Sequence, residues 1–344
     1  GEGALIGGGG SLLGIGNALG GSVRIPASYN GVYGFKPTAQ RLSTRPYPYS
    51  FPSVPYLYPT DGPLAATQEG LNDLMRIVLT DEDSLNLDVN VPPLAWNPAL
   101  FNTSRRYKIG YYTNIISTRP LPSQVRAVEE AKAALLALGY ELVPFTIPDG
   151  DGVMDWTISG LWPDNGVAAM AAPLDYEHPI YKDSFLYNFA TPYHKMLRDF
   201  GFEKSYGVSS IWGAIEMRDK YMNYHLRIYD LMRAAGIDAL LCPTTISPAL
   251  KVTTPVTIDV AMYTYTAYYN FLDFPAGSLK VGEYSAVDEA AMAGYIPKNK
   301  FEQQLKDEAV GMLGLPLSVQ IVAPSFRDEV VLSIMTNLDA AINA

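Results

Sequence analysis

The first 38 residues hold the feature that most restricts how this chain can fold, because glycines interrupt an otherwise apolar segment at short intervals. Gly7 to Gly10 stand in a row, and Gly14, Gly16, Gly20 and Gly21 follow. Glycine permits positive φ and close approach of backbones, so we expect tight loops here rather than regular helix. A linker would be polar and rich in serine, whereas this segment interleaves Leu, Ile and Val. We therefore expect it to be buried beside a ligand or a catalytic atom.

The composition fits a soluble globular enzyme and excludes two other classes. The 344 residues are 48% hydrophobic and 17% charged, with a net charge of −10. No basic block is present that would attract nucleic acid, and no apolar run is long enough to span a membrane. The single cysteine excludes a disulfide framework and indicates an intracellular, reducing compartment.

Hydrophobic periodicity downstream predicts an α/β fold. Residues 107–112, 123–138 and 141–147 read as strand, helix and strand, which is typical of a mixed or parallel sheet with covering helices. We expect one mixed, mostly parallel central sheet covered by helices on both faces. The aromatic stretch at about 150–232 is interpreted as a variable helical insert over a cleft. Further helices are expected at 69–80 and 328–342, strands at 238–242 and 315–323, a helix or strand at 261–271, and an irregular loop at 39–63.

The strongest candidate for chemistry is the sequence Gly20-Gly21-Ser22. A serine directly after two glycines can present its hydroxyl beside bare backbone N–H groups. Acyl transfer needs that pairing of a nucleophile with donors about 3 Å from the oxyanion that forms. The N–H groups of Leu19, Gly20, Gly21 and Ser22 are the candidate donors, although the pattern alone also fits a plain turn.

The same glycines offer a second hypothesis, a dinucleotide-binding turn. Gly14-x-Gly16-x-x-x-Gly20 approximates that fingerprint, which also requires an acidic residue about 20 positions further on. No acidic residue lies between Glu2 and Asp61, and Pro26 interrupts the segment that follows. Both observations disfavour this alternative.

The glycine-rich segment resembles the amidase signature. Residues 1–5, 20–27 and 33–38 carry the resemblance, and further stretches are similar to the fatty-acid amide hydrolase branch in particular. They run in the family's order across nearly the whole chain: 91–94, 107–112, 240–244, 269–277 and 314–320.

The resemblance implies hydrolysis of carboxylic amides through an acyl intermediate on Ser22, with Leu19 to Ser22 forming the oxyanion hole. It implies a small-molecule amide substrate with a sizeable apolar acyl group and no metal or cofactor. Phe326 would belong to the acyl pocket, and Arg24 would support the oxyanion loop. We expect an intracellular protein, cytoplasmic or peripheral to an internal membrane, with a homodimer and membrane contact as further options.

The sequence departs from the amidase pattern in two respects. The family's bridging Ser would fall just ahead of Gly1 and its Lys further upstream, so we interpret residues 1–344 as a catalytic domain lacking its amino-terminal portion. The nearest lysine, Lys36, stands in the motif's structural Lys-Pro-Thr. The usual Thr-Asp before the oxyanion loop is Asn17-Ala18, which would leave Arg24 without an acidic partner.

Two alternatives therefore stay open beside the amide hydrolase. One is the glutaminase-type subunit of a tRNA amidotransferase. The other is a truncated paralogue without catalytic activity.

The remaining reactive side chains have simpler interpretations. His178, His194 and His225 do not fit a zinc motif and are expected on the surface or packed between helices. Cys242 is expected to be a buried, inert thiol. Trp212 is assigned to core packing rather than to a membrane-contacting cap.

Overall fold

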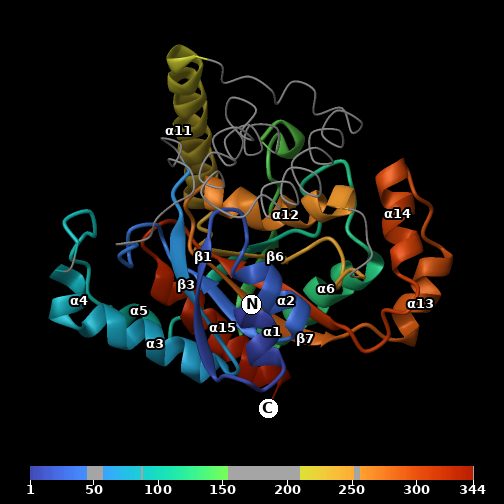
Figure 1. Cartoon of the computed structure of the whole chain (residues 1–344), viewed down its shortest axis with the longest axis horizontal. Helices are drawn as coiled ribbons and strands as arrows, with labels where there is room; N and C mark the ends of the chain where they lie inside the picture. Colours follow the sequence, from blue (N-terminus) through green and yellow to red (C-terminus); the bar gives the residue numbers. More distant parts are fainter. Residues whose placement is uncertain (45–56, 87, 154–209, 252–255, 344) are drawn as a thin grey trace, which may run out of the picture.

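The computed structural model describes residues 1–44, 57–86, 88–153, 210–251 and 256–343, and these form one α/β unit around a mixed sheet (Figure 1). The α/β fold with a mixed central sheet is confirmed. In the described residues the sheet has eight strands in the order β1-β3-β2-β7-β8-β6-β4-β5. The strands are β1 (Leu13–Ala18), β2 (Tyr33–Lys36), β3 (Thr60–Ala65), β4 (Lys108–Tyr111), β5 (Glu141–Pro144), β6 (Ala239–Pro243), β7 (Ala276–Glu283) and β8 (Pro316–Val322).

The described helices precede, connect and follow these strands. They are α1 (Glu2–Gly7), α2 (Arg24–Asn30), α3 (Gln68–Thr80), α4 (Glu82–Asn86), α5 (Pro98–Phe101), α6 (Pro122–Ala137), α11 (Ile211–Ala234), α12 (Val256–Phe271), α13 (Ala286–Ala293), α14 (Lys300–Glu308) and α15 (Asp328–Ile342). Every helix and strand expected between 69 and 147 and after 235 is present to within a few residues, and 261–271 is resolved as helix. The strand β7 and the helices α13 and α14 were not predicted.

The expectation of a mostly parallel sheet is wrong. Among the strands that the structure describes, β4–β5 and β4–β6 pair in parallel, while the other five neighbouring pairs are antiparallel. The parallel signal came from β4, α6 and β5, which form the one clear strand–helix–strand unit of the sequence. Strands β7 and β8 instead pair antiparallel across the excursion that carries α13 and α14.

Helices cover both faces of the sheet, as predicted, and adjacent residues of β2 show this directly. A side chain on Gly34 would approach Ala27 of α2 within 2.7 Å, so this position faces α2. The next residue, Phe35, pairs with Gly277 of β7, where a Cβ would approach the Met335 methyl of α15 within 2.9 Å. Because successive residues of a strand face opposite sides, α2 and α15 pack on opposite faces.

The expectation of loops without regular helix in residues 1–38 is wrong, since α1, β1, α2 and β2 lie there. The glycines of α1 serve close packing rather than positive φ. A Cβ on Gly3 would lie 2.7 Å from Pro26 Cβ, and one on Gly7 would lie 2.9 Å from Asn30 Cβ. The missing side chains therefore let α1 contact α2 backbone to backbone.

The end of the predicted irregular loop at 39–63 is also corrected, because β3 begins at Thr60. Proline in a strand usually indicates an edge, yet β3 lies between β1 and β2. Its ladder with β2 covers only Leu64 and Ala65, so Pro63 lies beyond that ladder and costs no hydrogen bond there.

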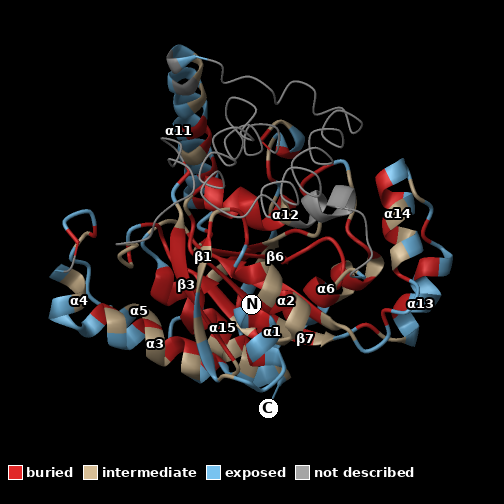
Figure 2. Cartoon of the chain, viewed as in Figure 1, coloured by how far each residue is buried: buried red, intermediate tan, exposed pale blue. Residues whose placement is uncertain are grey.

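Helix α11 extends from the sheet body and is exposed along much of its length (Figures 1 and 2). It contacts α12 through buried aromatic residues, with the ring centroids of Tyr221 and Phe271 4.6 Å apart. Trp212 is 67% exposed, so its assignment to the core is wrong. Most of the predicted insert, residues 154–209, lies outside the described residues. No helix in the described ranges has the length and apolar character needed to cross a bilayer.

One carboxylate ties α14 to the loop ahead of α6. Glu302 is fully buried and accepts hydrogen bonds from the Arg119 guanidinium and from the backbone amides of Arg119 and Lys298. Burial opposes its ionisation, but these hydrogen bonds outweigh burial and hold the pKa of Glu302 at about 2.

We expect Glu302→Gln to lower the free energy of unfolding at pH 7 by about 2 kcal/mol, because the charge-assisted bonds to Arg119 are lost. The folded pKa lies below the unfolded one, so this contribution is complete above about pH 5 and declines as pH falls toward 2. Urea unfolding at pH 7 and pH 3 measures it. The exposed Glu289→Gln is the matched control, and equal effects of both variants at pH 7 would contradict the assignment.

Candidate active site

Ser22 lies in the short turn that joins the end of β1 to the start of α2. Ala18 ends the strand, Arg24 begins the helix, and Ser22 between them is exposed to solvent. Gly21 has φ of +136°, a conformation that is practically restricted to glycine. The sequence therefore places the hydroxyl at the surface of a sharp strand-to-helix turn, and the turn requires the glycine directly ahead of it.

The backbone N–H groups predicted to bind an oxyanion are free of ladder bonds in the described structure. Within the described ranges, the amides of Leu19, Gly20, Gly21 and Ser22 donate no backbone or side-chain hydrogen bond. Buried or half-buried amides that lack a protein partner are unusual and are typical of binding sites. The turn thus combines an exposed hydroxyl with unused donors, as acyl transfer requires.

Helix α12 holds this turn from the other side. The Thr266 hydroxyl donates to the carbonyl of Gly20 at 2.8 Å, and the Asn270 side-chain amide donates to the carbonyl of Ala18 at 3.1 Å. A Cβ on Gly21 would lie 2.7 Å from Thr266 Cβ and closer still to its hydroxyl. The turn and the helix are therefore in direct contact.

Arg24 is fully buried below the turn and is held by neutral acceptors. Its guanidinium donates to Gln320 Oε1 at 2.9 Å, to the carbonyl of Thr266 at 2.8 Å and to Asn270 Oδ1. No carboxylate of the described residues forms an ion pair with it, and burial lowers the pKa of Arg24 to about 9. The sequence correctly indicated that the acidic partner is missing, but amide and carbonyl oxygens take its place.

The asparagine that precedes Ala18 has a partner on the neighbouring strand. Asn17 Nδ2 donates to Asp61 Oδ1 of β3 at 2.7 Å, across the register pair Asn17–Asp61. Burial raises the pKa of Asp61, and the bond from Asn17 opposes that shift. This contact fixes the end of β1, where the turn begins.

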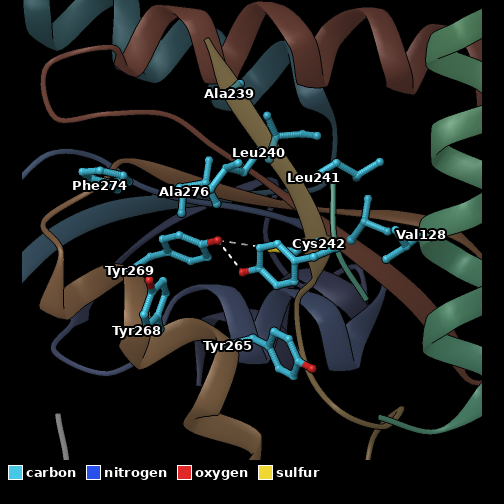
Figure 3. Packing of buried hydrophobic residues seen from close by; sticks show 14 of the residues in the cluster. Val128, Ala239, Leu240, Leu241, Cys242, Tyr265, Tyr268, Tyr269, Phe274 and Ala276 are labelled. Atoms are coloured by element: carbon cyan, nitrogen blue, oxygen red, sulfur yellow. Dashed lines mark hydrogen bonds between the residues drawn. The ribbon is translucent and has the colours of Figure 1, made fainter. Parts of the chain in front are cut away.

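Tyrosine side chains anchor α12 in the core. Tyr265, Tyr268 and Tyr269 of α12 are fully buried, and Tyr269 points toward Cys242 of β6 (Figure 3). The hydroxyl of Tyr269 is bonded to that of Tyr112, and the Cys242 thiol lies 3.7 Å from it. Cys242 is fully buried, as predicted, and burial raises the pKa of its thiol to about 11.

The other predicted residues lie apart from this arrangement. His225 packs between Tyr221 and Phe274, as expected for a helix-packing histidine, while His178 and His194 lie outside the described residues. Lys36 is buried on β2, where its ammonium donates to the carbonyl of Pro37. Phe326 lies between β8 and α15 and is 44% exposed, so its place in an acyl pocket stays a prediction.

Sequence reasoning did not identify Thr266, Asn270 or Gln320 as parts of the site. A usable signal was present, because Thr266 and Asn270 are the two polar residues spaced i, i+4 in an otherwise tyrosine-rich helix. Their partners, however, lie about 250 positions away in the sequence.

The family model described as Amidase matches residues 1–332, and the chain belongs to that family. It is 32% identical to fatty acid amide hydrolase 1 of Caenorhabditis elegans over 361 residues, which cover 99% of this chain and 62% of that protein. It is 33% identical to fatty-acid amide hydrolase 1 of Sus scrofa, over 98% of this chain and 60% of the pig protein. The chain thus spans about three fifths of the length of these relatives.

Solved structures share the fold. A fatty acid amide hydrolase superposes with a TM-score of 0.80 at 21% identity, covering 100% of this chain and 58% of that one. A 6-aminohexanoate cyclic dimer hydrolase superposes with a TM-score of 0.69, also at 21% identity, covering 99% and 67%.

Proposed function

We propose that the protein hydrolyses carboxylic amides with a sizeable apolar acyl group, through an acyl intermediate on Ser22. One observation carries the proposal: an exposed serine hydroxyl follows two glycines in a turn whose four amides are unused within the described residues. The relatives named as fatty acid amide hydrolases support the choice of substrate.

The chemistry follows from the turn. The Ser22 Oγ bonds to the substrate carbonyl carbon, and the backbone N–H groups of Leu19 to Ser22 stabilise the negative oxygen that forms. The carbon–nitrogen bond then breaks, the amine leaves with a proton, and water hydrolyses the acyl ester. The amidase resemblance assigns the proton transfers to a lysine and a bridging serine, which match no residue among 1–344.

Active-site labelling tests the proposal. We expect a fluorophosphonate probe to modify the full-length protein at one position, with the phosphonate found by mass spectrometry on the peptide that contains Ser22. Competition by amides of increasing acyl length should strengthen with chain length, because longer chains bury more apolar surface.

Other outcomes would favour the alternatives. Turnover of glutamine together with a stable second subunit would support the glutaminase. Absence of labelling in a folded full-length protein would support a paralogue without catalytic activity.

A further inference from the structure

We propose that Thr266 and Asn270 of α12 are positioning residues that aim the oxyanion-binding N–H groups, an inference that rests on the proposed function of Ser22. Both side chains reach the turn from one helix and both donate to its carbonyl oxygens. Neither touches the exposed hydroxyl of Ser22 in the described contacts, so their role is to orient the backbone.

Because a peptide group is planar, the two hydrogen bonds from α12 also fix the direction of two candidate donor N–H groups. In a planar trans peptide, the C=O of one residue and the N–H of the next point in opposite directions. The carbonyl of Ala18 points to Asn270, so the N–H of Leu19 points away from α12. The carbonyl of Gly20 points to Thr266, so the N–H of Gly21 points away from α12 as well.

A third peptide of the turn is fixed by α2 itself. The carbonyl of Gly21 accepts the N–H of Ile25 at 2.9 Å, which directs the N–H of Ser22 away from the start of that helix. Three of the four candidate donors thus belong to peptides with an anchored carbonyl. The carbonyl of Leu19, which sets the direction of the Gly20 N–H, accepts no hydrogen bond within the described residues.

The helix that supplies both side chains is itself held in place. Thr266 and Asn270 are separated by four residues and therefore share one face of α12. Tyr265, Tyr268 and Tyr269 are buried in the core (Figure 3), and Gln320 bonds the carbonyl of Tyr265 at 3.1 Å. A rigid support of this kind is what preorganised donors require.

Arg24 joins the two positioning residues into one network. Its guanidinium donates to the backbone carbonyl of Thr266 and to the side-chain oxygen of Asn270. Asn270 therefore accepts from Arg24 with its oxygen and donates to Ala18 with its nitrogen. An aspartate at this position would keep the first bond and lose the second, which separates the two roles.

The test measures second-order rate constants of fluorophosphonate labelling for variants of the full-length protein. We expect Thr266→Val, which is nearly isosteric but has no hydroxyl, to lower the rate constant by about ten- to a hundred-fold. Thr266→Ser keeps the donor and should remain within about threefold of the wild type. Asn270→Asp should lower the rate constant in the same way as Thr266→Val.

Thr336→Val on α15 is the matched control, because the hydroxyl of Thr336 also donates to a carbonyl at 2.8 Å, that of Leu332. It should change stability without changing labelling per folded molecule. Hydrogen–deuterium exchange gives a second readout, in which the bonded amides on either side of the turn, within residues 13–18 and 25–30, should exchange faster in Thr266→Val and Asn270→Asp than in the control.

The inference is overturned if Thr266→Val and Asn270→Asp are labelled as fast as the wild type. It is also overturned if their labelling rate constants fall only by the fraction of protein that is unfolded, as in the control. Failure of the proposed function gives a different result, because the wild-type protein itself would then not be labelled. In that case the exchange rates of residues 13–18 and 25–30 still decide whether α12 holds the turn.

Discussion

Replacing Ser22 by alanine is expected to lower amide turnover of the full-length protein by about 10⁴-fold or more and to abolish fluorophosphonate labelling. Removal of the nucleophile from a serine hydrolase costs on this scale because no second group can form the acyl intermediate. The side chain is exposed and forms no hydrogen bond in the described structure, so the free energy of unfolding should change by no more than about 0.5 kcal/mol.

Ser28 provides the opposite case, because it is a buried serine on α2, the helix that follows the turn. Ser28→Ala should lower stability while each folded molecule still reacts at Ser22. Steady-state hydrolysis and thermal unfolding of both variants measure the contrast. Turnover that survives in Ser22→Ala, or is lost to the same degree in Ser28→Ala, would remove Ser22 from its assigned role.

Replacing Gly21 by alanine is expected to have the next largest effect, on folding and reactivity together. The new methyl would lie 2.7 Å from Thr266 Cβ and 2.8 Å from Ile25 Cδ1, and φ of +136° would itself be strained. We expect a loss of about 3–5 kcal/mol in unfolding free energy, from strain and overpacking combined. Labelling of the molecules that remain folded should fall about a hundred-fold, because the turn must move off α12.

Two comparisons separate the causes of this loss. Gly236→Ala tests backbone strain alone, since Gly236 has φ of +66° and nothing lies within 4 Å of its Cβ position. We expect Gly236→Ala to lower the free energy of unfolding by about 1 kcal/mol. Adding Thr266→Ala to Gly21→Ala removes the hydroxyl that the new methyl would meet, and should recover part of the lost stability. A Gly21→Ala variant no less stable than Gly236→Ala would contradict the close contact with α12.

The glycine-lined turn that carries the candidate nucleophile Ser22 was predictable from the sequence because its signal is local. The two glycines stand directly ahead of Ser22 in the chain, whereas the strand before them and the helix after them were not predicted. The long match to the amidase signature supplied the fold class and the candidate donors. The same local reading correctly found that Arg24 lacks an acidic partner.

The supports of the site were not predictable because they depend on contacts across the whole chain. Asn270 and Thr266 lie more than 240 positions from the carbonyls they bind. The prediction of strand direction was wrong for a related reason, because β7 and β8 pair antiparallel across an excursion that local sequence patterns do not reveal. Glycine was misread in α1, where close helix contact and not positive φ explains Gly3 and Gly7.

The close packing of α2 at three glycines has a consequence for how the candidate site can vary. At Gly3, Gly7 and Gly34, an added Cβ would lie within 3.0 Å of the Cβ of Pro26, Asn30 and Ala27 respectively, so α2 packs closely against α1 and β2. The height of the Ser22 hydroxyl above the sheet thus depends on residues that carry no side chain. We expect a single carbon added at one of these contacts to shift that hydroxyl.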